Sequence, residues 1–213
     1  IKKAYLYWAA SYEPAVGESP DTEVRFQGEY VYDNSPLTEF FNSGSRYFYN
    51  GKADVTSIVK WNMNTEYTME ELNIYNQGRH CSSNTTLGGW ALLVIYEDDN
   101  EPFQVLNLFD GFQIYFDSTL ILTPNNFEIP STTEGKHAHI TWEGDSYGDN
   151  EILRIETSKG TYDLNDGVNP VGNQFNSVSN IYDSSNDDTL GVDVDIYDIG
   201  GYLQEGDKSV KTT

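Results

Sequence analysis

The stretch Lys3-Ala4-Tyr5-Leu6-Tyr7-Trp8, near the start of the chain, decides the fold class because its residues alternate with period two. Side chains two positions apart project from the same face of a strand, so Ala4, Leu6 and Trp8 share one face. The same alternation recurs through most of the 213 residues, and no stretch has helical periodicity beyond a turn or two. The sequence therefore predicts an all-β protein.

Further strands are predicted wherever β-branched and aromatic residues alternate with polar ones. Their ranges are Glu23–Tyr32, Ser45–Asn50, Tyr67–Tyr75, Gln104–Phe116, His137–Trp142, Glu151–Thr157 and Val192–Tyr197. The near-continuous apolar run Gly88–Glu97 predicts a central strand covered on both faces, and Asn50-Gly51 predicts a hairpin turn. Two short helical turns, each led by a capping aspartate, are predicted over Asp54–Val59 and Asp198–Leu203.

The opening motif returns in the second half of the chain as Ala138-His139-Ile140-Thr141-Trp142. After each copy comes a polar loop, then a strand that opens with Glu23 or Glu151, and later an Asp-led turn. This order predicts an internal duplication, with chance similarity among strands as the alternative. We expect two tandem jelly-roll-like antiparallel β-sandwiches, the first over residues 1–125 and the second over residues 126–213.

The second half has no counterpart of the apolar run Gly88–Glu97, and Ser209–Thr213 reads as the beginning of its next strand. An incomplete sandwich exposes an apolar groove and unpaired strand edges. We therefore expect strand addition from elsewhere, by other copies of the chain or by neighbouring β domains, including polypeptide that follows Thr213.

The charge balance excludes two classes of partner. The chain has 34 acidic and 12 basic residues, a net charge of −22 that repels nucleic acid and anionic lipid headgroups. The longest apolar run, Trp90–Tyr96, is too short to span a bilayer, so no membrane insertion is expected. The single Cys81 forms no disulfide framework, and the start at Ile1 without a signal-like segment suits a processed product or a fragment.

Seven segments, in order along nearly the whole chain, carry a family resemblance. They are Lys3–Trp8, Gly89–Asp98, Phe109–Phe112, Trp142–Asp145, Asn169-Pro170, Asn173–Ser177 and Asp193–Asp195. Together they resemble exported bacterial surface modules of unknown function, which occur in large secreted, adhesin-like multidomain proteins. The resemblance implies an extracellular or cell-surface location. Family members usually continue past the point matching Thr213 into another strand, and this chain departs from them there.

Calcium is the candidate cofactor, because hard cations are held by clustered oxygen ligands on loops. Two acidic loops offer such ligands, residues 143–151 and 183–188, although neither has EF-hand spacing. The candidate ligands are Glu143, Asp145, Asp149 and Glu151 in the first loop, and Asp187 and Asp188 in the second. The alternative is that both are solvated acidic loops.

Histidines provide the remaining candidates for chemistry. His137 and His139 lie two apart on one strand face, which would suit the beginning of a zinc site, but no third ligand is identifiable. The more ordinary interpretation is a pair of solvent-facing side chains. His80 and Cys81 adjoin without a visible orienting partner, so no catalytic pair is assigned to them.

The expected function is therefore a non-enzymatic structural or adhesive role, with a fibre or pilus-like filament assembled by strand exchange as one form. A carbohydrate-binding module is the first alternative, since exposed aromatic rings can stack on glycans. The candidate rings are Tyr12, Tyr30, Tyr32, Tyr47 and Tyr49. A glycoside hydrolase is the second alternative, which would need two carboxylates about 5–10 Å apart in a cleft.

Overall fold

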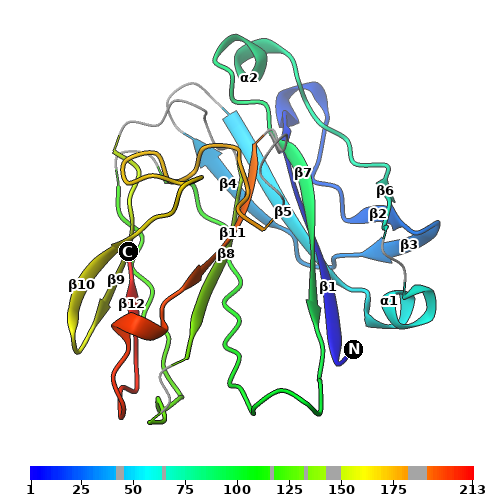
Figure 1. Cartoon of the computed structure of the whole chain (residues 1–213). Coiled ribbons are helices and arrows are strands. Elements are labelled where there is room, and N and C mark those ends of the chain that lie inside the picture. Colours follow the sequence, from blue (N-terminus) through cyan, green and yellow to red (C-terminus); the bar gives the residue numbers. More distant parts are fainter. Residues whose placement is uncertain (42–45, 64–65, 116–117, 132–133, 143–149, 182–190) are drawn as a thin grey trace. The chain divides into compact units, whose positions relative to one another are not determined.

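The computed structural model describes residues 1–41, 46–63, 66–115, 118–131, 134–142, 150–181 and 191–213 (Figure 1). Antiparallel strands predominate over short helices, which confirms the all-β class. The chain divides into two compact units. The first contains Ile1–Gln104 and Phe109–Ile114, and the second contains Val105–Leu108 and Tyr115–Thr213.

The main sheet of the first unit has four antiparallel strands in the order β4-β5-β1-β7. Their bounds are Lys3–Tyr12 for β1, Leu37–Phe41 for β4, Arg46–Asp54 for β5 and Gly88–Ile95 for β7. β1 is central because it pairs with β5 on one side and with β7 on the other. The predicted alternation holds, since Ala4, Leu6 and Trp8 are completely buried in the core of this unit.

Smaller elements surround this sheet. A second, three-stranded sheet has the order β3-β2-β6, and three short helices connect the strands. The bounds are Glu23–Phe26 for β2, Glu29–Tyr32 for β3, Met69–Glu70 for β6, Pro14–Val16 for η1, Thr56–Asn62 for α1 and Gly78–Ser82 for α2. Phe26 of β2 and Tyr49 of β5 join the buried cluster around Trp8, so both sheets contribute to one core.

The second unit contains two separate antiparallel sheets. One pairs β11 with β8, and the other has the order β10-β9-β12. The bounds are Lys136–Trp142 for β8, Leu153–Thr157 for β9, Gly160–Leu164 for β10, Val192–Asp198 for β11 and Lys211–Thr212 for β12, with the helix η2 over Gly200–Tyr202. Their apolar core includes Ile155, Tyr197 and Leu203. Leu122 and Asn125 pair with the C-terminal segment, so the second unit begins before the expected boundary at residue 126.

Several predicted strands differ from those observed. Glu23–Tyr32 is a hairpin of β2 and β3 rather than one strand, because Gln27 and Gly28 both have positive φ and form its turn. Of Tyr67–Tyr75, only Met69–Glu70 is a strand, and the described part of Gln104–Phe116 contains none. β7 is an edge strand with mostly half-buried side chains, not a central strand covered on both faces.

The predicted turn at Asn50-Gly51 is wrong, because both residues lie inside β5. Gly51 is opposite Trp8, and a Cβ added to it would lie 2.2 Å from Cε2 of the indole. Asn50 donates a side-chain hydrogen bond of 3.2 Å to the carbonyl of Trp8. This Asn-Gly pair therefore makes room for a buried indole instead of reversing the chain.

Both predicted Asp-led turns are present and occupy matching places in the two units. Asp54 Oδ1 accepts from the amide of Thr56 (3.0 Å), and Asp198 Oδ1 accepts from the amide of Gly200 (2.9 Å). The residue after each aspartate donates to the partner strand, Val55 to the carbonyl of Ala4 and Ile199 to that of Gly135. β11 and β8 thus correspond to β5 and β1 as paired strands that end in an Asp-led turn.

The hydrogen bonding therefore aligns Ala4 with Gly135. The sequence motif instead aligns Ala4 with Ala138, which lies three residues later. Three is an odd number, and an odd shift moves every side chain of a strand to its opposite face. His137 and His139 of β8 therefore take the places that Leu6 and Trp8 occupy in β1. This shift determines which side chains line the candidate site.

Candidate functional site: the β8–β11 sheet

The two histidines of β8 face the interior of the second unit, so their expected exposure to solvent is wrong. The side chain of His139 is only 13% exposed, and His137 is half-buried, whereas Ala138 between them is exposed. They share a face with alternate residues of β11, because register pairs His139 with Asp195 and Thr141 with Asp193. A polar surface therefore occupies the inner face of this sheet.

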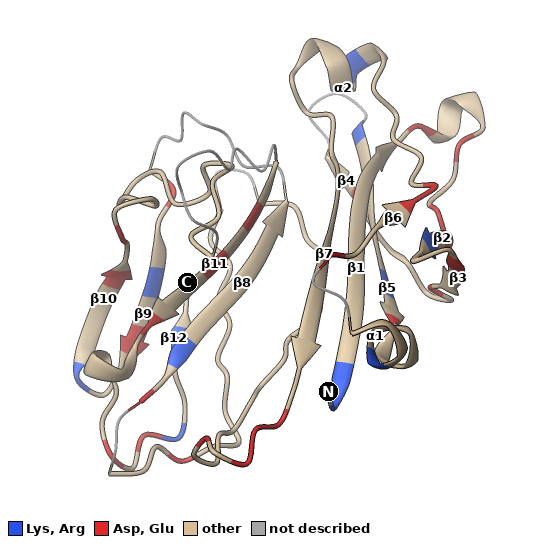
Figure 2. Ribbon diagram, turned by 45° about the vertical axis from the view of Figure 1, so that its right-hand side comes forward, with Lys and Arg blue, Asp and Glu red and all other residues tan. Residues whose placement is uncertain are grey.

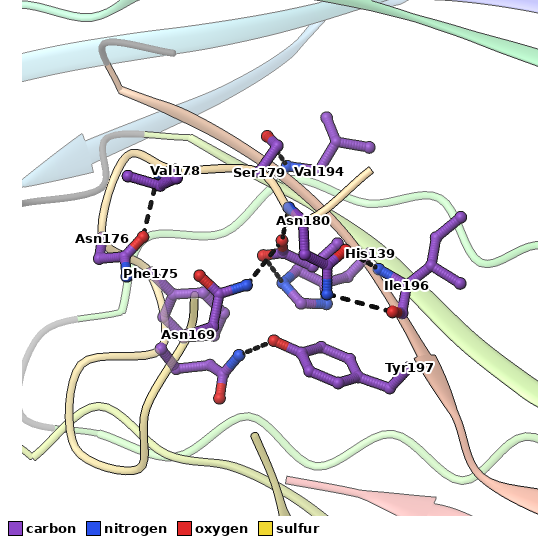
Figure 3. A network of polar contacts seen from close by, with 12 residues as sticks. His139, Asn169, Phe175, Asn176, Val178, Ser179, Asn180, Val194, Ile196 and Tyr197 are labelled. Carbon is purple, nitrogen blue, oxygen red and sulfur yellow. Dashed lines mark hydrogen bonds and ion pairs between the residues drawn. The ribbon is translucent and has the colours of Figure 1, made fainter. Parts of the chain in front are cut away.

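Asp195 is the centre of that surface and is completely buried. Its Oδ1 accepts hydrogen bonds of 2.8 Å from Asn169 Nδ2 and from the backbone amide of Asn180. Its Oδ2 lies 3.4 Å from Nε2 of His139 (Figure 3). Buried charge is tolerated when it is paired and hydrogen-bonded, and Asp195 meets both conditions when the imidazole is protonated.

Aromatic rings hold the imidazole of His139 in place. It stacks on Tyr197 with a centroid distance of 6.2 Å and meets the edge of Phe175 at 5.5 Å. The side-chain amide of Gln174 is hydrogen-bonded to the hydroxyl of Tyr197, and Gln174 is completely buried. Residues from β8, β11 and the segment 166–180 thus form one network.

Two groups beside this network have shifted pKa values. Desolvation by burial raises the pKa of Asp193 to about 6, and the nearby charge of Asp195 adds to this effect. The backbone amides of Ser177 and Val178 act in the opposite direction and lower this pKa. Desolvation also lowers the pKa of His137 to about 4, with a contribution from His139. In both groups, burial shifts the protonation equilibrium toward the neutral form relative to water.

The network contains buried acceptors that no donor from the described residues reaches, among them Asn169 Oδ1 and Gln174 Oε1. Such oxygens suit a cation, but within the described ranges no three His, Cys, Asp or Glu side chains are grouped to hold a metal ion. The predicted zinc pair of His137 and His139 therefore has Asp195 close to His139. Among the described residues, these side chains do not form a complete set of metal ligands. What this arrangement does is fix the loop 166–180 against β11 and place titratable groups in the core.

The outer edge of β11 is covered by that same loop. Ser179 Oγ accepts from the amide of Val194 (2.8 Å). The side chain of Asn180 accepts from the amide of Ile196 (2.8 Å) and donates to its carbonyl (3.1 Å), so it imitates a neighbouring strand. These bonds satisfy the amide of Val194 and both backbone groups of Ile196, which point away from β8.

No described residue covers the outer edge of β8 in this way. Backbone groups of successive residues point to opposite sides of a strand, and Gly135 points toward β11 through its bond with Ile199. The residues whose backbone points away are therefore Lys136, Ala138, Ile140 and Trp142. No hydrogen bond from the described part of the chain reaches their outward backbone groups.

The predicted calcium ligands fall mostly outside the described residues. This applies to Glu143, Asp145, Asp149, Asp187 and Asp188. Glu151 is described: it forms β-bridges with Gly172 and Asn173, and its Oε2 accepts from the amide of Phe175 at 3.2 Å. Its carboxylate therefore participates in fixing the loop that lines the His139–Asp195 network.

The other candidate residues lie in the first unit. His80 is buried against Phe48 and Tyr75, and its Nδ1 lies 3.1 Å from the carbonyl of Thr85, while Cys81 is exposed. The imidazole thus belongs to the core and has no described contact with the thiol.

The proposed sugar-stacking tyrosines separate into two groups. Tyr49 is buried and Tyr12 packs against Tyr47 across β1 and β5, so these three are structural. Tyr30 and Tyr32 are half exposed on one face of β3. A nearby surface hollow contains carboxylates and no ring; its lining is Ser19, Pro20, Asp21, Thr22, Glu23, Glu71 and Asn73.

Comparison of the chain with protein-family models, with curated proteins and with solved structures finds no significant match. Among the described residues, no helix is long and apolar enough to cross a membrane. The β8–β11 sheet is therefore the basis for proposing a function. The sequence alternation identifies its strands, but only the register reveals the inward histidines and the uncovered edge.

Proposed function

We propose that this chain is a non-enzymatic structural module of an extracellular or bacterial cell-surface assembly. In this proposal it joins a neighbouring polypeptide by adding a β-strand to the outer edge of β8. The observation that carries the proposal is the row of outward backbone groups on Lys136, Ala138, Ile140 and Trp142 that no described residue satisfies. Main-chain hydrogen bonding to an extended partner would satisfy them.

Protection of the other edges, with the exception of β7, supports this choice. Proteins commonly guard edge strands with charged side chains or cover them with loops. β3, β4, β6 and β10 each contain an acidic residue, and β11 has both acidic residues and the cover from Ser179 and Asn180. β12 also pairs with Leu122. β8 has neither an acidic residue nor a described cover.

The internal correspondence supports it further. β1, the counterpart of β8, is paired along both edges, with β5 on one side and β7 on the other. β8 pairs with β11 alone among the described strands. A strand added to β8 would complete the arrangement that the first unit already has.

The test is to remove one outward donor without disturbing the sheet. Ile140→Pro eliminates an amide that points away from β11, and proline is tolerated at such edge positions. We expect the mass of the wild type to increase with concentration, measured by analytical ultracentrifugation, and the proline variant to remain folded but to lack this increase. Ile140→Ala is the matched control, because it shortens the side chain and keeps the amide. Equal association of the proline variant and the wild type would contradict the proposal.

A further inference from the structure

We infer that the strand received by β8 is the free edge of β7 from a second copy, so that copies join head to tail. The inference rests on the proposed function and identifies the partner at the same edge. Three features support it: the outward backbone groups of β7, the absence of carboxylates on both strands and the charges at the strand ends.

The outer edge of β7 is as uncovered as that of β8. The amide of Ser11 donates to the carbonyl of Leu87 (2.9 Å), so Leu87 and the alternate residues after it direct their backbone toward β1. The backbone groups that point away belong to Gly88, Trp90, Leu92 and Val94. Within the described ranges no strand pairs with this side of β7. Its eight residues are close in number to the seven of β8, so the two edges suit one ladder.

Charge restricts where two copies can meet. With a net charge of −22, copies repel one another over most of their surface. β7 has no charged residue, and Lys136 is the one formally charged residue of β8. Both strands are therefore almost entirely tan in Figure 2, the colour of residues other than Lys, Arg, Asp and Glu. The other uncovered edge strands contain carboxylates. Contact between β7 and β8 is therefore the edge-to-edge approach with least repulsion.

The residues at the ends of the two strands favour the antiparallel orientation. In an antiparallel pair, the C-terminal end of β7 lies beside the N-terminal end of β8. β7 is followed by the acidic residues Glu97, Asp98 and Asp99, and β8 begins with Lys136. The orientation brings opposite charges together, whereas pairing β8 with another β8 would place Lys136 beside Trp142 of the other copy.

Different edges on the two partners make the contact heterologous. A heterologous contact that does not close into a ring continues as an open filament. In this filament the sheet β4-β5-β1-β7 of one copy would continue into β8-β11 of the next. Each added copy would leave one free β7 edge and one free β8 edge at the ends of the filament.

Site-specific crosslinking tests the partner directly. Cys81→Ser removes the native thiol, and two single-cysteine variants are then made, one with Ala138→Cys on β8 and one with Leu92→Cys on β7. Residues whose backbone groups pair across a ladder present their side chains on the same face, so these two thiols would be neighbours. A short bismaleimide should join the two variants when they are mixed and should not join either one to itself. Ile196→Cys, on the covered edge of β11, is the matched control and should not crosslink to Leu92→Cys.

Each alternative has its own result. Self-crosslinking of the Ala138→Cys variant would overturn the inference in favour of β8–β8 pairing, with strand addition at β8 retained. If a doubly substituted variant gave only intrachain crosslinks in a monomer, β7 and β8 of one chain would pair, and the inference would be wrong. A monomer at every concentration, with rapid amide exchange along β8 and no crosslink, would overturn the proposed function as well.

Discussion

The two units place chemically opposite pairs at corresponding positions. In the first unit the indole of Trp8 lies over Gly51, and in the second the imidazole of His139 lies beside Asp195. Both pairs join the two strands that lead to an Asp-led turn. The Trp8–Gly51 contact is apolar and tightly packed. The His139–Asp195 pair belongs to a buried polar network in which some acceptors have no donor among the described residues. The same backbone arrangement therefore accommodates an apolar core in one unit and a polar core in the other.

The difference has consequences for stability. Burial of apolar surface is independent of pH, so the first unit depends on how completely its core is filled. A buried network of ionisable groups depends on protonation, because each shifted pKa links folding to proton binding. We therefore expect volume changes to have their largest effect in the first unit and pH changes in the second.

The largest expected effect is that of Trp8→Ala. Trp8 is completely buried against Gly51, and deletion of an indole from a core typically costs about 3–5 kcal/mol of unfolding free energy. The loss should be confined to the first unit. NMR during urea unfolding can follow both units, through the indole resonance of Trp90 in the first and of Trp142 in the second. A loss below about 1 kcal/mol, or an equal loss in both units, would contradict the comparison.

A second, smaller effect is expected from pH in the second unit, where two groups act in opposite directions. Since the pKa of Asp193 is raised to about 6, its contribution to stability falls as pH rises from about 4 to 6. Since the pKa of His137 is lowered to about 4, its contribution rises as pH rises from about 4 to 6.5. With 1.36 kcal/mol for each unit of pKa shift, each amounts to about 3 kcal/mol, and the two largely cancel.

Single substitutions should reveal this cancellation. Asp193→Asn leaves His137 unopposed, so the second unit should lose stability when the pH falls from about 6.5 to 4. His137→Asn leaves Asp193 unopposed, so stability should increase over the same acidification. The measurement is the urea midpoint of the Trp142 resonance at several pH values, compared with that of Trp8 as the internal control. Parallel pH profiles for the two variants would show that the opposed shifts are absent.

The local residue pattern was sufficient to predict the all-β class and strands β1, β8 and β11 from period-two alternation, and both Asp-led turns from their capping aspartates. It could not fix which face of β8 is buried, since Ala-x-aliphatic-x-Trp aligns Ala138 with Ala4 and the hydrogen bonding aligns Gly135 instead. It also misassigned Asn50-Gly51, because the need for a glycine there comes from Trp8, which is 43 residues away in sequence. Partners distant in sequence determined both outcomes.

The smallest expected effects concern the two Asp-led turns, which look alike in sequence and differ in their bonding. Asp54 accepts from the amide and hydroxyl of Thr56 and also pairs with Lys3, whereas Asp198 accepts only from the amide of Gly200 among the described contacts. Loss of a capping side chain costs about 0.5–2 kcal/mol. We expect Asp54→Ala to lie near the upper end of this range for the first unit and Asp198→Ala near the lower end for the second, measured by urea unfolding. Because Thr56 Oγ1 also accepts a hydrogen bond of 2.9 Å from the amide of Ala4, the double variant Asp54→Ala/Thr56→Ala should cost more than Asp54→Ala alone. A larger cost for Asp198→Ala would show that the helix η2 contributes more to its unit than α1 does to the first.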